Sequence, residues 1–250
     1  MLTRRLILAA PPILLATPAR SAVSSFDTFL ANLRAEAQKA GISQRTLDAA
    51  LAGVTPNQKV IERDRRQAEF TMTWSRYRSL VINDKRIADG RRAVDQNRDL
   101  LRRVVDRFGV SARVITGIWG LESGFGVTQG DYRVIEALAT LAWEGRRAKF
   151  FHGELMAALK ILEQGHIAPS RMLGSYAGAM GQPQFMPTSF LRYAFDFDGD
   201  GKRDIWNSRS DVLGSIGNYL AGAGWRAGEG WGQAVTLPPG FDTSQASRDN

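Results

Sequence analysis

The sequence predicts a mainly α-helical protein, and three observations support this expectation. Apolar residues recur three or four positions apart along most of the chain, as in Phe26, Leu30 and Leu33, and this is helical spacing. No convincing strand alternation occurs before Ala234, where Ala-Val-Thr-Leu is the one candidate strand. Hydrophobic residues make up 44% of the 250 positions, which is enough to build the core of one or two domains.

Residues 1–22 have the features of a signal peptide that is removed on export. Arg4 and Arg5 precede an apolar stretch from Leu6 to Leu15, and small residues surround Arg20. The paired arginines also resemble a twin-arginine signal, so the general secretory and twin-arginine routes both stay open. No later run of about 18 apolar residues follows, and we therefore expect no transmembrane segment.

Charge and cysteine content exclude several classes of protein. The formal net charge is +8, and without the three arginines of the signal it still suits a polyanionic partner. The basic residues form scattered short pairs such as Arg91-Arg92, which are typical of solvated helix faces, so we expect no nucleic-acid partner. The absence of cysteine excludes a disulfide framework, a zinc–thiolate site and a thiol nucleophile.

The expected helices follow one another in order along the chain. Breaks at Gly41, Pro56 and Gly90 divide residues 23–110 into several helices. Ser111 is then a candidate N-cap for a helix through Trp119. Further helices are expected at residues 134–143, 150–162 and 212–220.

Glu122 continues the apolar stripe of the helix that begins after Ser111. It lies four residues after Ile118, three after Trp119 and eight after Val114, so helical geometry places its carboxylate on the face that we expect to be buried. Burial raises the pKa of a carboxylic acid, as a general acid near neutral pH requires. The alternative is a structural Glu that pairs with an Arg or caps a turn.

The segment from Ser175 to Pro187 combines small residues with two side-chain amides, an aromatic ring and methionines. The amides of Gln182 and Gln184 can pair with sugar hydroxyl and N-acetyl groups. Phe185 can pack against a pyranose face, as can the neighbouring methionine. We interpret the segment as a sugar-binding wall, and the alternative is a buried junction that lets helices pack closely.

Acidic residues recur at alternating positions after residue 195. Asp196, Asp198 and Asp200 stand at positions 1, 3 and 5 of the loop, and glycine stands at position 6, as at the start of a calcium loop. Position 12 is not Glu, so either Asp204 or Asp211 would close the site. The alternative is an acidic turn with a solvated ion.

Four ordered segments together resemble the lytic murein transglycosylase B family. They are residues 118–126 (IWGLESGFG), 136–142 (EALATLA), 175–187 (SYAGAMGQPQFMP) and 196–206 (DFDGDGKRDIW). Further matches at residues 86–91, 217–220 and 224–225 extend the resemblance over about residues 70–240. It implies a lysozyme-like, mainly helical core that acts on peptidoglycan in cell-wall turnover in the periplasm.

The resemblance also implies a mechanism that needs no cofactor. The Glu that matches Glu122 protonates the glycosidic oxygen between N-acetylmuramic acid and N-acetylglucosamine and then acts as a base. The muramic 6-hydroxyl attacks the anomeric carbon, which gives a 1,6-anhydro end without water. This differs from the two-carboxylate scheme of most glycosidases. A lysozyme-type hydrolase and an inactive glycan-binding relative stay open as alternatives.

The site residues that the resemblance implies fall into two groups. The substrate-binding group matches Ser175, Gln184, Phe185, Tyr219 and Phe150. A structural calcium ion in an EF-hand-like loop is implied at Asp196, Asp198, Asp200, Lys202 through its carbonyl, and Asp211.

The implied organisation has four parts: a signal peptide at 1–22, an N-terminal helical region at 23–110, the catalytic core at 111–233 with its calcium loop at 196–211, and a C-terminal segment at 234–250. Family members usually continue beyond Leu237-Pro238-Pro239-Gly240, so we expect this segment to be truncated. The expected partner is a peptidoglycan glycan strand, and the expected state is a monomer.

Overall fold

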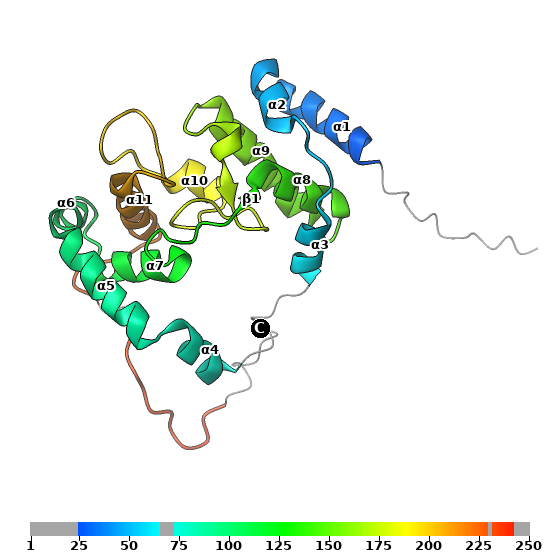
Figure 1. Ribbon diagram of the computed structural model, residues 1–250. Coiled ribbons are helices and arrows are strands. Elements are labelled where there is room, and N and C mark those ends of the chain that lie inside the picture. Colours follow the sequence, from blue (N-terminus) through cyan, green and yellow to red (C-terminus); the bar gives the residue numbers. More distant parts are fainter. Residues whose placement is uncertain (1–24, 66–72, 230–231, 243–250) are drawn as a thin grey trace, which may run out of the picture.

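The computed structural model describes residues 25–65, 73–229 and 232–242, and it confirms the mainly helical prediction (Figure 1). The predicted signal peptide lies outside the described residues. The candidate strand at Ala234 is wrong, because residues 232–242 form neither helix nor strand. No helix in the described part of the chain is both long enough and apolar enough to cross a membrane.

The elements follow the expected order. They are α1 Phe26–Lys39, α2 Gln44–Leu51, α3 Gln58–Arg65, α4 Trp74–Val81, α5 Asp84–Gln96, α6 Arg98–Phe108, α7 Ala112–Ser123, β1 Tyr132–Arg133, α8 Val134–Glu144, α9 Ala148–Glu163, the short 3-10 helix η2 Pro169–Arg171, β2 Leu173–Gly174, α10 Pro187–Tyr193 and α11 Arg209–Gly222.

Local chemistry sets several helix ends. The hydroxyls of Ser25 and Ser43 accept hydrogen bonds from backbone N–H groups and begin α1 and α2. Ser111 stands at the predicted N-cap of α7, although its side chain makes no capping bond. Gly124 ends α7 in the left-handed conformation, with φ of 58°, which favours glycine.

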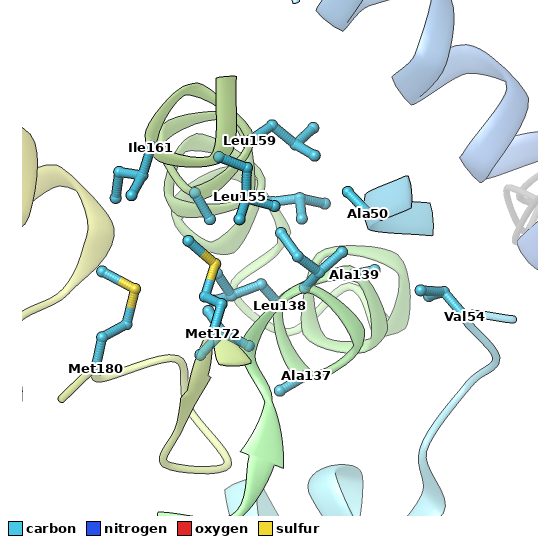
Figure 2. Close-up of a cluster of buried hydrophobic side chains, with 14 of the residues drawn as sticks. Ala50, Val54, Ala137, Leu138, Ala139, Leu155, Leu159, Ile161, Met172 and Met180 are labelled. Atoms are coloured by element: carbon cyan, nitrogen blue, oxygen red, sulfur yellow. The ribbon is translucent and has the colours of Figure 1, made fainter. Parts of the chain in front are cut away.

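The buried apolar side chains form two clusters. The first cluster joins α1, α2 and α3 to α8, α9 and α10, and it also includes residues of the 175–187 segment. Figure 2 shows part of this cluster, with Leu138, Leu155, Leu159 and Met172 between α8, α9 and the short strands.

The second cluster joins α5 and α6 to α7 and α11. Trp119, Ile115 and Ile216 lie in it and are 2% exposed or less. The two clusters therefore group helices that are far apart in the sequence. The domain boundaries expected from the sequence stay predictions.

The 175–187 segment is shaped by short stretches of β-structure. β1 and β2 pair antiparallel, with Tyr132 opposite Gly174. Isolated bridges then join Gly174 to Met180 and Met180 to Phe185. The segment consequently folds back on itself twice and presents the residues after Met180 next to α7 and α11, where the two clusters meet.

Candidate active site

Glu122 lies in the last turn of α7, at the edge of its buried face. That face consists of Ile115, Thr116, Trp119, Gly120 and Ser123. The expectation that Glu122 itself lies on the buried face is therefore wrong, because its side chain is exposed and Ile118 is only half-buried. Successive helical residues are rotated by about 100° around the helix axis. The Glu122 side chain therefore points about 100° away from that of the buried Ser123, which follows it in the sequence.

A pocket of about 270 Å³ opens beside Glu122. α7 contributes two lining residues, the segment after Gly181 contributes four, α10 contributes one and α11 contributes two. The lining residues are Ile118, Glu122, Pro183, Gln184, Phe185, Met186, Ser189, Ile216 and Tyr219. Phe185 belongs to the first cluster and Ile216 to the second, so the pocket lies where the two clusters meet.

The surroundings of Glu122 favour its neutral form. Loss of hydration beside the pocket raises the pKa of the Glu122 carboxyl above its ordinary value. No described residue forms a hydrogen bond or an ion pair with this carboxylate. The alternative, a structural Glu that pairs with an Arg, therefore has no support among the described residues. Among the described residues that line the pocket, Glu122 is the sole carboxylate.

Gln184 and Phe185 are held in place within the pocket wall. Gln184 has a φ of 50°, and its Nε2 donates to the carbonyls of Gln129 at 3.1 Å and Gly181 at 2.8 Å. These bonds occupy the nitrogen and leave Oε1 as the side chain's hydrogen-bonding group for a ligand. The ring of Phe185 packs 5.5 Å, centroid to centroid, from that of Tyr219.

Four of the six predicted catalytic and substrate-binding residues line the pocket, and two do not. The hydroxyl of Ser175 accepts hydrogen bonds from the backbone N–H groups of Ala177 and Ala179, so it holds the turn that leads into the wall. Phe150 is 49% exposed on α9 and packs edge-on against Phe151. The substrate-binding roles of Ser175 and Phe150 stay predictions.

Two lining residues escaped the sequence analysis. Ser189 lies in the first turn of α10, two residues after Pro187. Ile216 precedes Tyr219 by three residues on α11, and this spacing places both on one helix face. The spacing from Tyr219 was the available signal for Ile216, whereas no pattern in the sequence distinguishes Ser189.

The acidic loop connects α10 to α11 and brings three carboxylates together. Asp196, Asp198 and Asp211 each offer an oxygen, and these oxygens lie within 4.8 Å of one another. The loop is held by its own backbone, because Asp196 accepts hydrogen bonds from the N–H groups of Gly199, Asp200 and Gly201. Clustered carboxylate oxygens are the donors that a hard cation such as Ca²⁺ prefers.

Asp211, not Asp204, completes this cluster. The buried Asp211 accepts hydrogen bonds from the N–H groups of Phe197 and Asp204, at 2.8 and 2.7 Å, and burial raises the pKa of its carboxyl to about 6. Asp204 instead accepts bonds from the N–H groups of Trp206 and Asn207. The Asp200 carboxylate lies outside the cluster and accepts a hydrogen bond from the Lys202 N–H, and the predicted role of the Lys202 carbonyl stays a prediction.

The fold and the pocket define a mainly helical protein of the lysozyme-like class, with one carboxylate beside an aromatic wall. The family model for the transglycosylase SLT domain matches residues 25–250. The chain belongs to this family, and the resemblance seen in its motifs is confirmed.

Known relatives share both sequence and structure with the chain. It is 40% identical over 176 residues to the membrane-bound lytic murein transglycosylase B of Escherichia coli K12, covering 68% of this chain and 48% of that protein. SltB3 from Pseudomonas aeruginosa, solved in complex with NAG-NAM-pentapeptide, is 48% identical with a TM-score of 0.84, covering 88% of this chain and 59% of that one.

A third relative was solved with calcium. The Escherichia coli lytic transglycosylase Slt35, in complex with calcium, is 34% identical with a TM-score of 0.72, covering 85% of this chain and 69% of that one. The chain spans about half the length of the membrane-bound lytic murein transglycosylase B, the curated relative that it matches.

Proposed function

We propose that the chain is a lytic transglycosylase that cleaves the β-1,4 bond between N-acetylmuramic acid and N-acetylglucosamine in peptidoglycan. The observation that carries this proposal is that Glu122, with its raised pKa, is the single carboxylate among the described residues that line the pocket. A retaining glycosidase needs a second carboxylate as its nucleophile. A pocket with one carboxylate suits a reaction in which the substrate supplies the nucleophile.

Glu122 acts first as an acid and then as a base. Its carboxylic acid donates a proton to the glycosidic oxygen while the bond from that oxygen to the anomeric carbon breaks. The resulting carboxylate takes the proton of the muramic 6-hydroxyl, whose oxygen bonds to the anomeric carbon. The product is a 1,6-anhydromuramic end, no water is consumed, and the carboxylic acid of Glu122 is regenerated.

The pocket wall binds and orients the sugar. Gln184 presents Oε1 to hydroxyl or N-acetyl N–H groups, and the rings of Phe185 and Tyr219 offer apolar faces to the pyranose. Ser175 supports the wall through the turn that it holds. No cofactor is required for this chemistry.

The acidic loop is proposed to bind a structural Ca²⁺. Asp196, Asp198 and Asp211 are the side-chain ligands, and helix–loop–helix connection through α10 and α11 resembles an EF-hand. The further predicted ligands are Asp200, whose carboxylate lies outside this cluster, and the carbonyl of Lys202. Slt35, solved in complex with calcium, supports this assignment.

The proposed setting is the periplasm. The predicted signal at residues 1–22 directs export, and peptidoglycan glycan strands are the partner, with the chain acting as a monomer. The relative from Escherichia coli is described as membrane-bound, and SltB3 was solved with a NAG-NAM-pentapeptide.

Digestion of purified peptidoglycan tests the proposal. Mass spectrometry of the released fragments is expected to find 1,6-anhydromuramic ends, and Glu122→Gln is expected to release none. Fragments that are each heavier by one water identify a lysozyme-type hydrolase instead. Binding to intact sacculi without any released fragment identifies an inactive glycan-binding relative.

A further inference from the structure

Gln182 lies behind the pocket wall, and the proposed mechanism does not use it. Its side chain is 7% exposed, and it does not line the pocket, although Pro183 and Gln184 immediately after it do. Both ends of its amide are occupied. Oε1 accepts a hydrogen bond from Nε1 of Trp119 at 2.8 Å, and Nε2 donates to the carbonyl of Trp206 at 2.8 Å.

Trp119 carries the first of these bonds into the helix that bears Glu122. It stands three residues before Glu122, is 2% exposed and meets the ring of Phe125 edge-on at 5.6 Å. The guanidinium of Arg209 lies over its face at 5.1 Å. A buried indole N–H needs a partner, and Gln182 supplies it.

The second bond joins Gln182 to the end of the acidic loop. The backbone N–H of Gln182 also donates to the carbonyl of Ile205 at 2.9 Å. There is little free space around the amide, because a Cβ at Gly126 would lie 2.5 Å from its Oε1. The turn after α7 therefore closes directly over the side chain.

We propose that Gln182 is a positioning residue for Glu122, because it fixes α7 against the pocket wall through the indole of Trp119. This inference rests on the proposed function. Gln182 does not touch the substrate. It sets the distance between the carboxylate and a sugar held by the wall, and a misplacement of about 1 Å can cost roughly 10²-fold in rate.

Gln182→Met tests the proposal, because it keeps the length of the side chain and removes both amide bonds. With soluble uncrosslinked peptidoglycan strands as substrate, kcat is expected to fall at least about 10-fold while KM changes by less than about 2-fold. An unchanged kcat well below the melting temperature overturns the proposal, as does a raised KM with kcat unchanged.

Thr140→Val is the matched control. Thr140 is buried in α8, where its hydroxyl donates to the Glu136 carbonyl and accepts from the Asn57 N–H. The variant also loses buried hydrogen bonds, so it is expected to lower the melting temperature and leave kcat unchanged. An equal fall of kcat in both variants overturns the proposal, since general destabilisation then explains the effect.

Trp119→Phe removes the same bond from the other side. If Gln182 acts through the indole, kcat of the Gln182→Met, Trp119→Phe double variant falls no further than that of the worse single variant. If the fall in kcat of the double variant instead equals the product of the falls in the two single variants, the proposal is overturned. The single variant Trp119→Phe also keeps the proposal testable if Gln182→Met does not fold.

Nuclear magnetic resonance supplies a measurement that does not depend on activity. In Gln182→Met the indole N–H resonance of Trp119 is expected to move, and the pKa of Glu122 is expected to shift from its wild-type value. If the wild type cleaves no peptidoglycan, the proposed function fails, whereas these shifts still test the contact. Unmoved resonances in a folded variant overturn the positioning role.

Discussion

The two acidic regions of the molecule differ in how their carboxylates are held. Glu122 is exposed beside the pocket, and no described residue bonds to it. Asp196 of the acidic loop accepts three backbone hydrogen bonds, and Asp211, in the first turn of α11, accepts two. The pKa is raised by loss of hydration in both regions, at Glu122 and at Asp211.

This difference in hydrogen bonding distinguishes Glu122, which can exchange a proton, from the carboxylates of the acidic loop, which are fixed in place. A group without fixed partners can donate a proton and take one back without breaking protein hydrogen bonds. Carboxylates held by backbone N–H groups keep their oxygens in a set arrangement, as a cation site requires. We therefore assign chemistry to the first region and stability to the second.

Replacement of Glu122 is expected to have the largest effect. Glu122→Gln removes the acid and base while preserving shape, so kcat on peptidoglycan is expected to fall at least about 10³-fold. The melting temperature is expected to stay the same or rise, because a poorly hydrated carboxyl is lost. Calorimetry checks this, and a variant with residual activity near that of the wild type contradicts the assignment.

Calcium is expected to stabilise the fold through the acidic loop. At 100 times its Kd the ion contributes about 2.7 kcal/mol, which raises Tm by roughly 5–10 °C. Asp211→Asn is expected to abolish this rise, whereas Asp204→Asn keeps it because Asp204 lies outside the cluster. Thermal unfolding with and without a chelator measures both, and equal responses in the two variants would refute the site.

The pH dependence of kcat reports on Glu122. Because its pKa is raised, the acid stays protonated to a higher pH than an ordinary Glu, for which the pKa is about 4.3. kcat is expected to be highest on the acidic side of the raised pKa and to fall as the pH rises through it. A fall centred at or below the ordinary value contradicts the account, provided that circular dichroism finds the protein folded throughout.

Substitutions of the aromatic residues are expected to have the smallest effects. Tyr219→Leu removes a ring from the pocket wall and is expected to raise KM about 2- to 10-fold. Phe150→Leu is expected to change KM less, because Phe150 does not line the pocket. Steady-state kinetics compares the two variants. An equal rise in KM in both would show that Phe150 contributes to substrate binding as much as Tyr219 does.

Local patterns predicted the helices well, because periodicity and capping act within a few residues. They did not predict which side of α7 is buried. Val114 and Ile118 form one apolar stripe and Ile115 and Trp119 form another, and only packing against α5 and α11 selects the second. Glu122 is consequently at the edge of the buried face.

The candidate site was predictable where ordered motifs carry it and not where distant segments meet. Glu122, Gln184 and Tyr219 were identified from motifs, and the structure brings them to one pocket. Ser189 joins them only because α10 packs beside the wall, which no local pattern indicates. The choice of Asp211 over Asp204 likewise depends on how the loop folds back onto α11.

Digestion of peptidoglycan in heavy-oxygen water tests the central claim most directly. If Glu122 alone directs attack by the muramic 6-hydroxyl, the new ends are 1,6-anhydro and carry no label from the solvent. Incorporation of one labelled oxygen at each new muramic end would contradict the account, because water would then be the nucleophile.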